Sequence, residues 1–173
     1  MIVRFLQPTD DRSAFSCGDP DYDDFLRKYA AQNQFRHRVG KTLVAVDDEH
    51  VIGYATFALG EVSADVLPED LTRQLPRYPC PVVRLARLAV DVRYQGNGIG
   101  AYLVAEVLSM SLRVRGELGC VAVVVDALKS RQDFYAELGF MPMDVLQGRP
   151  RVAGTVPMVL MLSEIEEAQT SPE

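Results

Sequence analysis

Cysteine is scarce in this sequence, and long apolar runs are absent. The three cysteines, Cys17, Cys80 and Cys120, are scattered and odd in number, which argues against a disulfide framework. No apolar run approaches the ~20 residues that a membrane-spanning helix needs. The N-terminal stretch MIVRFLQPTDDR has neither the apolar region nor the cleavage site of a secretory signal. We therefore expect a cytoplasmic protein that does not enter a membrane.

Histidine and clustered positive charge are also scarce. His37 and His50 lie far apart, and no Cys/His spacing indicates zinc, so we predict no metal site. The net charge of -6 at pH 7 argues against general affinity for nucleic acid, DNA included. Residues 71–95 are the exception, because this segment contains several arginines and only one acidic residue, Asp91. These arginines either keep the chain soluble or form a local surface for an anionic ligand. They are Arg73, Arg77, Arg84, Arg87 and Arg93.

Length and hydrophobic patterning predict one domain with a mixed sheet. The chain has 173 residues, of which 48% are hydrophobic, so we expect a single domain over 1–163 and a frayed acidic tail over 164–173. Strands are predicted at 2–6, 42–46, 51–59, 82–90, 120–127 and 156–162. Helices are predicted at 20–34, 98–116 and 130–138, with a short one at 68–75. Ser130 and Asp133 have the spacing of a capping box. This order indicates the α/β class, with a central mixed sheet flanked by helices.

The stretch RLARLAVDVRYQGNGIGAYLV, residues 84–104, has the pattern of a phosphate site. An apolar strand leads into a polar turn, then into Gly96, Gly98 and Gly100, then into a helix. Glycines lower the steric cost of unusual backbone dihedrals. The start of a helix offers free amides and the positive end of its dipole. The stretch therefore predicts a ligand that carries phosphate.

Three other interpretations of the glycines are weaker. A simple turn needs only one glycine. A nucleotide P-loop would continue with Gly-Lys-Ser/Thr, whereas Ala101 and Tyr102 stand there. Gly96, Gly98 and Ala101 do match the G-x-G-x-x-A spacing of a dinucleotide fold, and the next strand ends at Asp126. In that fold, however, the strand runs almost directly into the first glycine, and here DVRYQ intervenes.

A resemblance to a known family accounts for more of the chain. Gln95-x-x-Gly98-x-Gly100 after an apolar strand resembles the acetyl-CoA pyrophosphate loop of the GNAT N-acetyltransferase superfamily. SRQDFYAELGF (130–140) resembles the F-Y-x-x-x-G-F helix at the end of that superfamily's core. Residues 15–30, 75–91 and 123–127 are similar to the GNAT toxins of bacterial toxin–antitoxin pairs. The short motifs L-P-R-Y-P and R-L-A-V-D are the most specific part of this resemblance.

This resemblance implies a fold, a reaction and partners. It implies a GNAT fold and direct transfer of acetyl from acetyl-CoA to a primary amine, namely the α-amine of aminoacyl-tRNA. It also implies a ribbon-helix-helix antitoxin as a partner, and related enzymes often form homodimers. An α-amine has an ordinary pKa of about 7.7, against about 10.4 for lysine, so much of it is neutral without a general base. The lack of an obvious base therefore favours an α-amine acceptor.

The resemblance also assigns the site residues. It places the pantetheine arm beside Leu88, Ala89 and Val90. It assigns Tyr135 as the acid that protonates the leaving thiolate, whereas the alternative for Tyr135 is a core aromatic residue. The five arginines and Glu61 are candidates for the acceptor site. The residues expected to bind the pyrophosphate and the rest of the cofactor are Gln95, Gly96, Asn97, Gly98, Ile99, Gly100, Ala101, Ser130 and Phe134.

Two other functions stay open at this point. One is a metabolic or protein N-acetyltransferase that acts on a small-molecule or peptide amine. The other is a non-catalytic module that binds coenzyme A or a protein partner. The presence of both Tyr135 and the glycine loop argues against the second, because a module without catalysis needs no acid.

Overall fold

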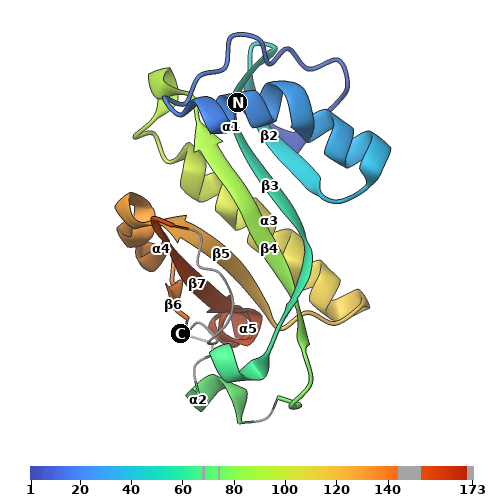
Figure 1. The fold of residues 1–173 in the computed structure, drawn as a ribbon, viewed down its shortest axis with the longest axis vertical. Helices are drawn as coiled ribbons and strands as arrows, with labels where there is room; N and C mark the ends of the chain where they lie inside the picture. Colours follow the sequence, from blue (N-terminus) through green and yellow to red (C-terminus); the bar gives the residue numbers. More distant parts are fainter. Residues whose placement is uncertain (68, 74, 144–152, 171–173) are drawn as a thin grey trace. The chain divides into compact units, whose positions relative to one another are not determined.

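The predicted strands and helical segments form in the predicted order along the chain. The computed structural model describes residues 1–67, 69–73, 75–143 and 153–170. Its seven strands form one sheet in the order β1-β2-β3-β4-β5-β7-β6, which confirms an α/β class with a central sheet (Figure 1). Backbone contacts divide the chain into two units, residues 1–58 with 85–107 and residues 59–84 with 108–173. A single domain over residues 1–163 stays a prediction.

The first unit contains the predicted hairpin. β2 (Lys41–Asp47) pairs antiparallel with both β1 (Ile2–Phe5) and β3 (His50–Val62). Asp48 and Glu49 between β2 and β3 both have positive φ, which suits the twist of a two-residue hairpin turn. The register passes from Ala45↔Gly53 to Val46↔Val51, so Ile52 is an extra residue in β3. Its carbonyl accepts the Asp91 amide at 2.9 Å, where β4 (Cys80–Val90) ends.

A helical segment over residues 20–37 confirms the predicted helix, with one difference. α1 (Pro20–Asp24) begins with Asp19 as its cap, which accepts the Asp21 amide at 3.0 Å, and with proline in its first turn. The segment then widens into two π-helical turns, η1 (Phe25–Tyr29) and η2 (Gln32–His37). The periodicity of the sequence predicted an ordinary α-helix. The π-helical turns were missed because a change from i−4 to i−5 bonding leaves no separate signal in so short a run.

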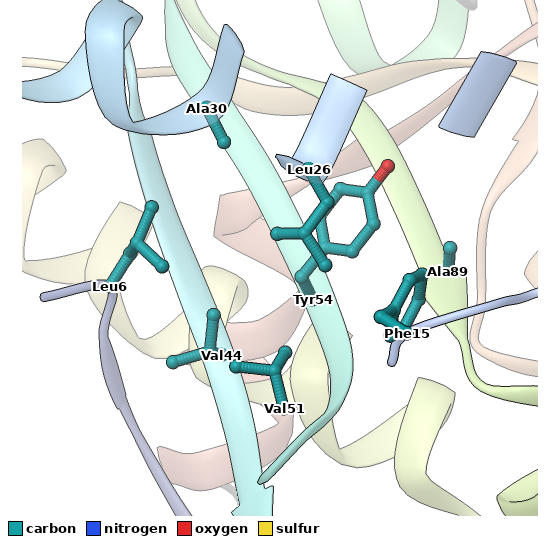
Figure 2. Close-up of a cluster of buried hydrophobic side chains, with 8 residues drawn as sticks. All are labelled: Leu6, Phe15, Leu26, Ala30, Val44, Val51, Tyr54 and Ala89. Atoms are coloured by element: carbon teal, nitrogen blue, oxygen red, sulfur yellow. The ribbon is translucent and has the colours of Figure 1, made fainter. Parts of the chain in front are cut away.

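The core of this unit lies between the helical segment and the sheet. Figure 2 shows Leu26 and Ala30 of the helical segment packing over Val44, Val51 and Tyr54 of the strands. The Tyr54 ring stacks on Phe25 with 6.2 Å between centroids, and its hydroxyl donates to the Tyr22 carbonyl at 2.9 Å. The start of the helical segment is thereby held against β3. The full cluster is Leu6, Phe15, Leu26, Ala30, Val44, Val51, Tyr54 and Ala89.

The second unit is built on an antiparallel β-ribbon. β5 (Ala122–Leu128) pairs with β7 (Thr155–Met161), which pairs in turn with the short β6 (Met141–Pro142) that the sequence did not predict. α2 (Glu69–Thr72) lies inside the predicted 68–75, of which residues 68 and 74 are outside the described part. η3 (Ala64–Val66) precedes it. α3 (Ile99–Glu117), like β3 and β4, has residues in both units.

Two local predictions for this unit are wrong. α4 (Gln132–Glu137) follows a 3-10 turn, η5 (Lys129–Arg131), and no side chain caps it, so the capping box at Ser130 does not form. The tail is not frayed up to residue 170, because α5 (Leu162–Thr170) forms there and residues 171–173 lie outside the described part. Leu162 is fully buried, and Arg115 Nε donates a hydrogen bond to Glu166 at 3.0 Å. These two contacts hold α5 in place. No described helix is long and apolar enough to cross a membrane.

Candidate functional site

The glycine loop joins β4 to α3 in the first unit. After Val90 the chain forms a 3-10 turn, η4 (Val92–Tyr94), and α3 begins at Ile99. Gly96 and Gly98 have φ of 79° and 77°, in the left-handed region that favours glycine. Apart from their chain neighbours, no atom of the described residues lies within 4 Å of the position that a Cβ would take at either glycine. These two glycines therefore serve the backbone conformation and leave open space above the loop.

Free amides line the start of α3. The first three amides of a helix have no partner within it, and here they belong to Ile99, Gly100 and Ala101. Among the described residues, the first amide of α3 bonded back to the chain is that of Tyr102, which donates to Gly98 at 3.0 Å. Such amides, together with the positive end of the helix dipole, suit an anion. The predicted pyrophosphate residues thus have a conformation that fits the group.

The polar side chains of the loop bond to backbone carbonyls of the loop, of Val90 and of Cys17. Gln95 Nε2 donates to the carbonyls of Val90 at 2.9 Å and Cys17 at 3.1 Å. Asn97 Nδ2 donates to the carbonyls of Tyr94 at 3.1 Å and Gln95 at 3.2 Å. These contacts brace the loop from inside. These bonds occupy the side-chain amide nitrogens of Gln95 and Asn97, and recognition of a ligand by the loop backbone stays a prediction.

A buried carboxylate holds the segment before the loop. The Asp91 side chain is only 1% exposed and accepts from Arg93 Nε at 2.8 Å, Arg93 Nη2 at 3.0 Å and the Ser16 amide at 3.1 Å. The Val92 amide returns a bond to the Ser16 carbonyl at 2.9 Å. The bonds from Arg93 lower the Asp91 pKa to about 2, against the opposing effect of burial. Arg93, which the sequence suggested as a contact for the amine substrate, therefore donates its hydrogen bonds to Asp91.

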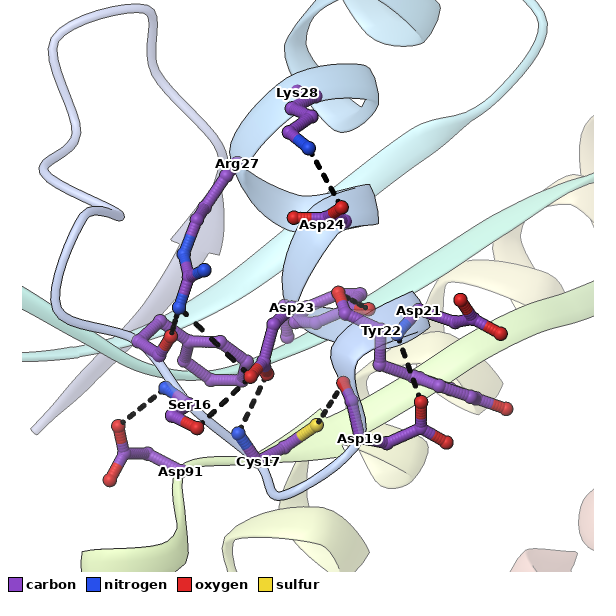
Figure 3. A network of polar contacts seen from close by, with 12 residues as sticks. Ser16, Cys17, Asp19, Asp21, Tyr22, Asp23, Asp24, Arg27, Lys28 and Asp91 are labelled. Atoms are coloured by element: carbon purple, nitrogen blue, oxygen red, sulfur yellow. Dashed lines mark hydrogen bonds and ion pairs between the residues drawn. The ribbon is translucent and has the colours of Figure 1, made fainter.

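A second buried carboxylate ties residues 15–17 to the helical segment. Figure 3 shows the Asp23 side chain pointing toward Ser16 and Cys17, and its carboxylate accepts the Cys17 amide at 2.7 Å and Ser16 Oγ at 3.0 Å. Arg27 donates to the Phe15 carbonyl from the same helical segment. Burial acts to raise the Asp23 pKa, but the bonds from Cys17 and Ser16 outweigh it and lower the pKa. Burial raises the pKa of the Cys17 thiol to about 11, which disfavours a thiolate nucleophile at neutral pH.

We expect Asp91→Asn to lower the free energy of unfolding at pH 7 by about 2–3 kcal/mol, the scale of a hydrogen bond to a charged group. The Asp91 pKa is depressed, so its contribution is full above the unfolded value of about 3.9 and is lost as the pH falls through about 2. The stability gap between wild type and variant should therefore narrow between pH 4 and pH 2. Urea unfolding followed by circular dichroism at several pH values measures it.

Asp24→Asn is the control for this prediction, because Asp24 pairs with Lys28 at 2.7 Å on an exposed surface. An exposed pair of this kind contributes about 0.3–0.5 kcal/mol. Equal stability of the two variants at pH 7 would show that Asp91 does not hold the segment.

Tyr135 lies in the second unit, on α4. It is 6% exposed. Its ring centroid lies 5.1 Å from that of Phe134 and 5.6 Å from that of Phe140, and both pairs pack edge to face. The Phe140 amide donates to the Tyr135 carbonyl at 3.0 Å, and Gly139, with φ of 93°, ends the helix. Ser130 is exposed in η5 and Phe134 is partly buried. The catalytic role of Tyr135 and the cofactor roles of Ser130 and Phe134 stay predictions.

The candidate acceptor residues have different environments. In the second unit Arg73 and Arg77 are exposed, and Arg84 pairs with Asp126 at 3.1 Å. Glu61 is exposed and lies within β3, although the sequence placed it just past that strand. In the first unit Arg87 lies over the rings of Tyr22 and Phe25. Among the described residues no group of three His, Cys, Asp or Glu side chains could hold a metal ion.

Sequence reasoning missed the bracing residues Ser16, Asp23 and Asp91. Asp23 belongs to an acidic run that looked like an ordinary first helical turn, and Asp91 appeared only as the one acid among arginines. The Asp-x-Arg spacing of Asp91 and Arg93 was the available signal, because the Asp91 side chain also accepts the Arg93 amide at 3.0 Å. Ser16 carries no such signal, since its hydrogen-bond partners Asp23 and Asp91 lie 7 and 75 positions away in the chain.

Comparisons with known proteins agree with this geometry. The family model of the acetyltransferase (GNAT) domain matches residues 38–142. The chain is 32% identical over 160 residues to the tRNA-acetylating toxin of Mycobacterium tuberculosis, covering 92% of this chain and 89% of that protein.

Solved structures of similar proteins give the same result. AtaT complexed with acetyl-methionyl-tRNAfMet matches with a TM-score of 0.86 and 25% identity, over 98% of this chain and 99% of that one. AtaTR bound with AcCoA matches with a TM-score of 0.78 and 26% identity, over 98% of each chain. The domain match, the glycine loop and the sheet together show that this chain belongs to the GNAT acetyltransferase family.

Proposed function

We propose that this protein transfers acetyl from acetyl-CoA to the α-amine of aminoacyl-tRNA. It is an N-acetyltransferase of the GNAT family. The observation that carries the choice of acceptor is the 32% identity, over 92% of the chain, to a tRNA-acetylating toxin. The similar AtaT, complexed with acetyl-methionyl-tRNAfMet, supports the same class of acceptor.

The residues of the loop would hold the cofactor. The amides of Ile99, Gly100 and Ala101 would receive the pyrophosphate, and Gly96 and Gly98 give it room. The last residues of β4, Leu88 to Val90, would run beside the pantetheine arm. When bound, acetyl-CoA supplies a thioester whose carbonyl carbon the amine attacks, so that a C–N bond forms and the C–S bond breaks.

One proton is needed for the leaving sulfur. Tyr135 would donate it. A phenol has an ordinary pKa of about 10, so Tyr135 is protonated at pH 7 and has a proton to give to the leaving thiolate, whose conjugate thiol has a pKa of about 8.5. General acid assistance of this kind contributes about 10²–10⁴ in rate. The attacking α-amine is about half neutral at a pH equal to its pKa of about 7.7, so it needs no strong base. The proton that its nitrogen loses as the C–N bond forms balances the proton that Tyr135 gives to the sulfur. An exposed carboxylate such as Glu61 is therefore not required.

The runner-up acceptor is a small-molecule or peptide amine. The observation that favours it is the net charge of -6, which gives the chain no general attraction for RNA. A ribbon-helix-helix antitoxin as the protein's partner is part of the proposal for the first acceptor only, whereas a homodimer is proposed with either acceptor.

A single assay tests the choice of acceptor. Purified protein is incubated with radiolabelled acetyl-CoA and total charged bacterial tRNA, with free amino acids, polyamines and a peptide mixture in parallel tubes. We expect label in the tRNA fraction that mild base releases together with the amino acid, and none with deacylated tRNA. Label found only in a small amine or a peptide would make the runner-up the function. Expression of the chain alone in bacteria should likewise stop growth if it acts as a toxin.

A further inference from the structure

Arg87 lies on a platform of aromatic rings within the first unit. It shares a face of β4 with Leu85 and Ala89, and Ala89 belongs to the core cluster of that unit. Its guanidinium carbon is 4.5 Å from the centroid of Phe25 and 5.3 Å from that of Tyr22. These distances are typical of cation–π contacts, which hold the planar group in a defined orientation.

The platform itself is rigidly built. Phe25 begins the π-helical turn η1 and stacks on Tyr54, which is fully buried. The Tyr54 hydroxyl donates to the Tyr22 carbonyl, so both residues beneath Arg87 are tied to β3. Tyr22 is partly buried, and burial raises the pKa of its phenol even though Arg87 acts to lower it. Arg87 is therefore positioned by contacts that involve no charge of opposite sign.

Other arginines of the protein are paired differently. Arg4 lies 2.6 Å from Asp10, Arg84 3.1 Å from Asp126, and Arg93 2.8 Å from Asp91. Among the described residues, no carboxylate oxygen lies within 4.0 Å of Arg87 and no group accepts a hydrogen bond from its side chain. A partly buried guanidinium has five N–H donors that aromatic rings do not satisfy. A guanidinium with such unsatisfied donors favours a bound anion.

The chemistry of a guanidinium restricts the ligand. The planar fork matches two coplanar oxygens of a phosphate, and aromatic packing preorganises it for such a contact. We propose that Arg87, held over Tyr22 and Phe25, binds a phosphodiester of the RNA acceptor and so favours amines carried by RNA over free amines. This inference rests on the proposed function. Because the chain has a net charge of -6, discrete contacts of this kind must supply the affinity for RNA.

A phosphate could also come from the cofactor. The glycine loop already offers free backbone amides for the pyrophosphate, beyond the end of β4. Arg87 lies earlier on that strand, against the helical segment of residues 20–37. We therefore assign it to the acceptor, and the experiment separates the two sources.

Three variants test the assignment. Arg87→Gln removes the charge, and Arg87→Lys keeps the charge and loses the planar fork. Arg113→Gln is the control, because Arg113 is exposed and its side chain contacts Met110 rather than aromatic rings or carboxylates. For each we would measure kcat/KM with total charged tRNA at several salt concentrations, the acetyl-CoA affinity by calorimetry, and thermal unfolding.

We expect Arg87→Gln to lower kcat/KM for charged tRNA by about 10-fold or more, the scale of one charge-assisted contact. The slope of log kcat/KM against log salt should become shallower by about 0.7, as for one phosphate contact on single-stranded RNA. Arg87→Lys should keep the salt slope and lose part of the activity. Acetyl-CoA affinity should stay unchanged in both variants, and Arg113→Gln should match the wild type in activity.

Each contrary result has a distinct meaning. Unchanged kcat/KM and salt slope in Arg87→Gln overturn the inference while the proposed function stands. Weaker acetyl-CoA binding with an unchanged tRNA salt slope assigns the phosphate to the cofactor and also overturns it. If the wild type labels no tRNA, the proposed function fails before any variant is made, and the inference fails with it. If Arg87→Gln unfolds at a clearly lower temperature than the wild type, Arg87→Lys decides the question. Wild-type activity in Arg87→Lys would show that no planar guanidinium is needed, and this overturns the inference.

Discussion

Tyr135→Phe is expected to lower kcat for acetyl transfer by about 10²–10⁴-fold, because the leaving thiolate loses its acid. The ring would stay in place. Tyr135 packs edge to face against Phe134 and Phe140, and phenylalanine keeps both contacts. Loss of the hydroxyl alone should lower the free energy of unfolding by no more than about 1–2 kcal/mol. Acetyl-CoA affinity should be close to wild type.

Steady-state kinetics, calorimetry and thermal unfolding measure these three quantities on one preparation. Tyr78→Phe is the matched control, since Tyr78 is 68% exposed and lies outside the α4 helix. A Tyr135→Phe enzyme with wild-type kcat would identify Tyr135 as a core aromatic residue. The proton for the thiolate would then have to come from elsewhere.

Gly98→Glu is expected to raise the dissociation constant for acetyl-CoA by at least about 100-fold. A residue with a Cβ is strained at a φ of 77°, and this strain costs about 1–2 kcal/mol. The added carboxylate would also stand beside the amides at the start of α3 and repel a pyrophosphate. No atom lies within 4 Å of the Cβ position, so the fold has room for the side chain.

Gly119→Glu separates loss of binding from loss of stability. Gly119 has φ of 90° and no atom within 4 Å of its Cβ position, as at Gly98, but it follows α3 instead of preceding it. Both variants should lose similar stability, and only Gly98→Glu should lose acetyl-CoA binding in calorimetry. An unchanged dissociation constant for Gly98→Glu would remove the glycine loop as the cofactor site.

Much of the site could be predicted because its requirements are local. Positive φ at Gly96 and Gly98 is a property of the backbone there, and a strand–turn–helix pattern is visible within residues 84–104. The hairpin of β2 and β3 is local in the same sense. The failures at Ser130 and in the tail have another cause. The helix at Leu162–Thr170 depends on Arg115 and on the burial of Leu162, which neighbouring residues do not signal.

The environments of the charged side chains required the tertiary structure. Arg87 and Arg93 belong to the same run of arginines, yet one lies on aromatic rings and the other is bonded to Asp91. Asp91 in turn accepts the amide of Ser16, from a residue 75 positions earlier in the chain. Which partner a charge meets depends on which distant segments the sheet brings beside it.

The amino-acid sequence alone thus determined the glycine turn between β4 and α3 and most strands and helices, because turn chemistry and hydrophobic periodicity act between near neighbours. The family followed from the resemblance of its motifs to those of known proteins. Only the tertiary structure decided that Asp91 is buried beneath Arg93 and Ser16, and that Arg87 lies on aromatic rings. The free energy of a buried charge depends on every group packed around it, and those groups come from distant parts of the chain.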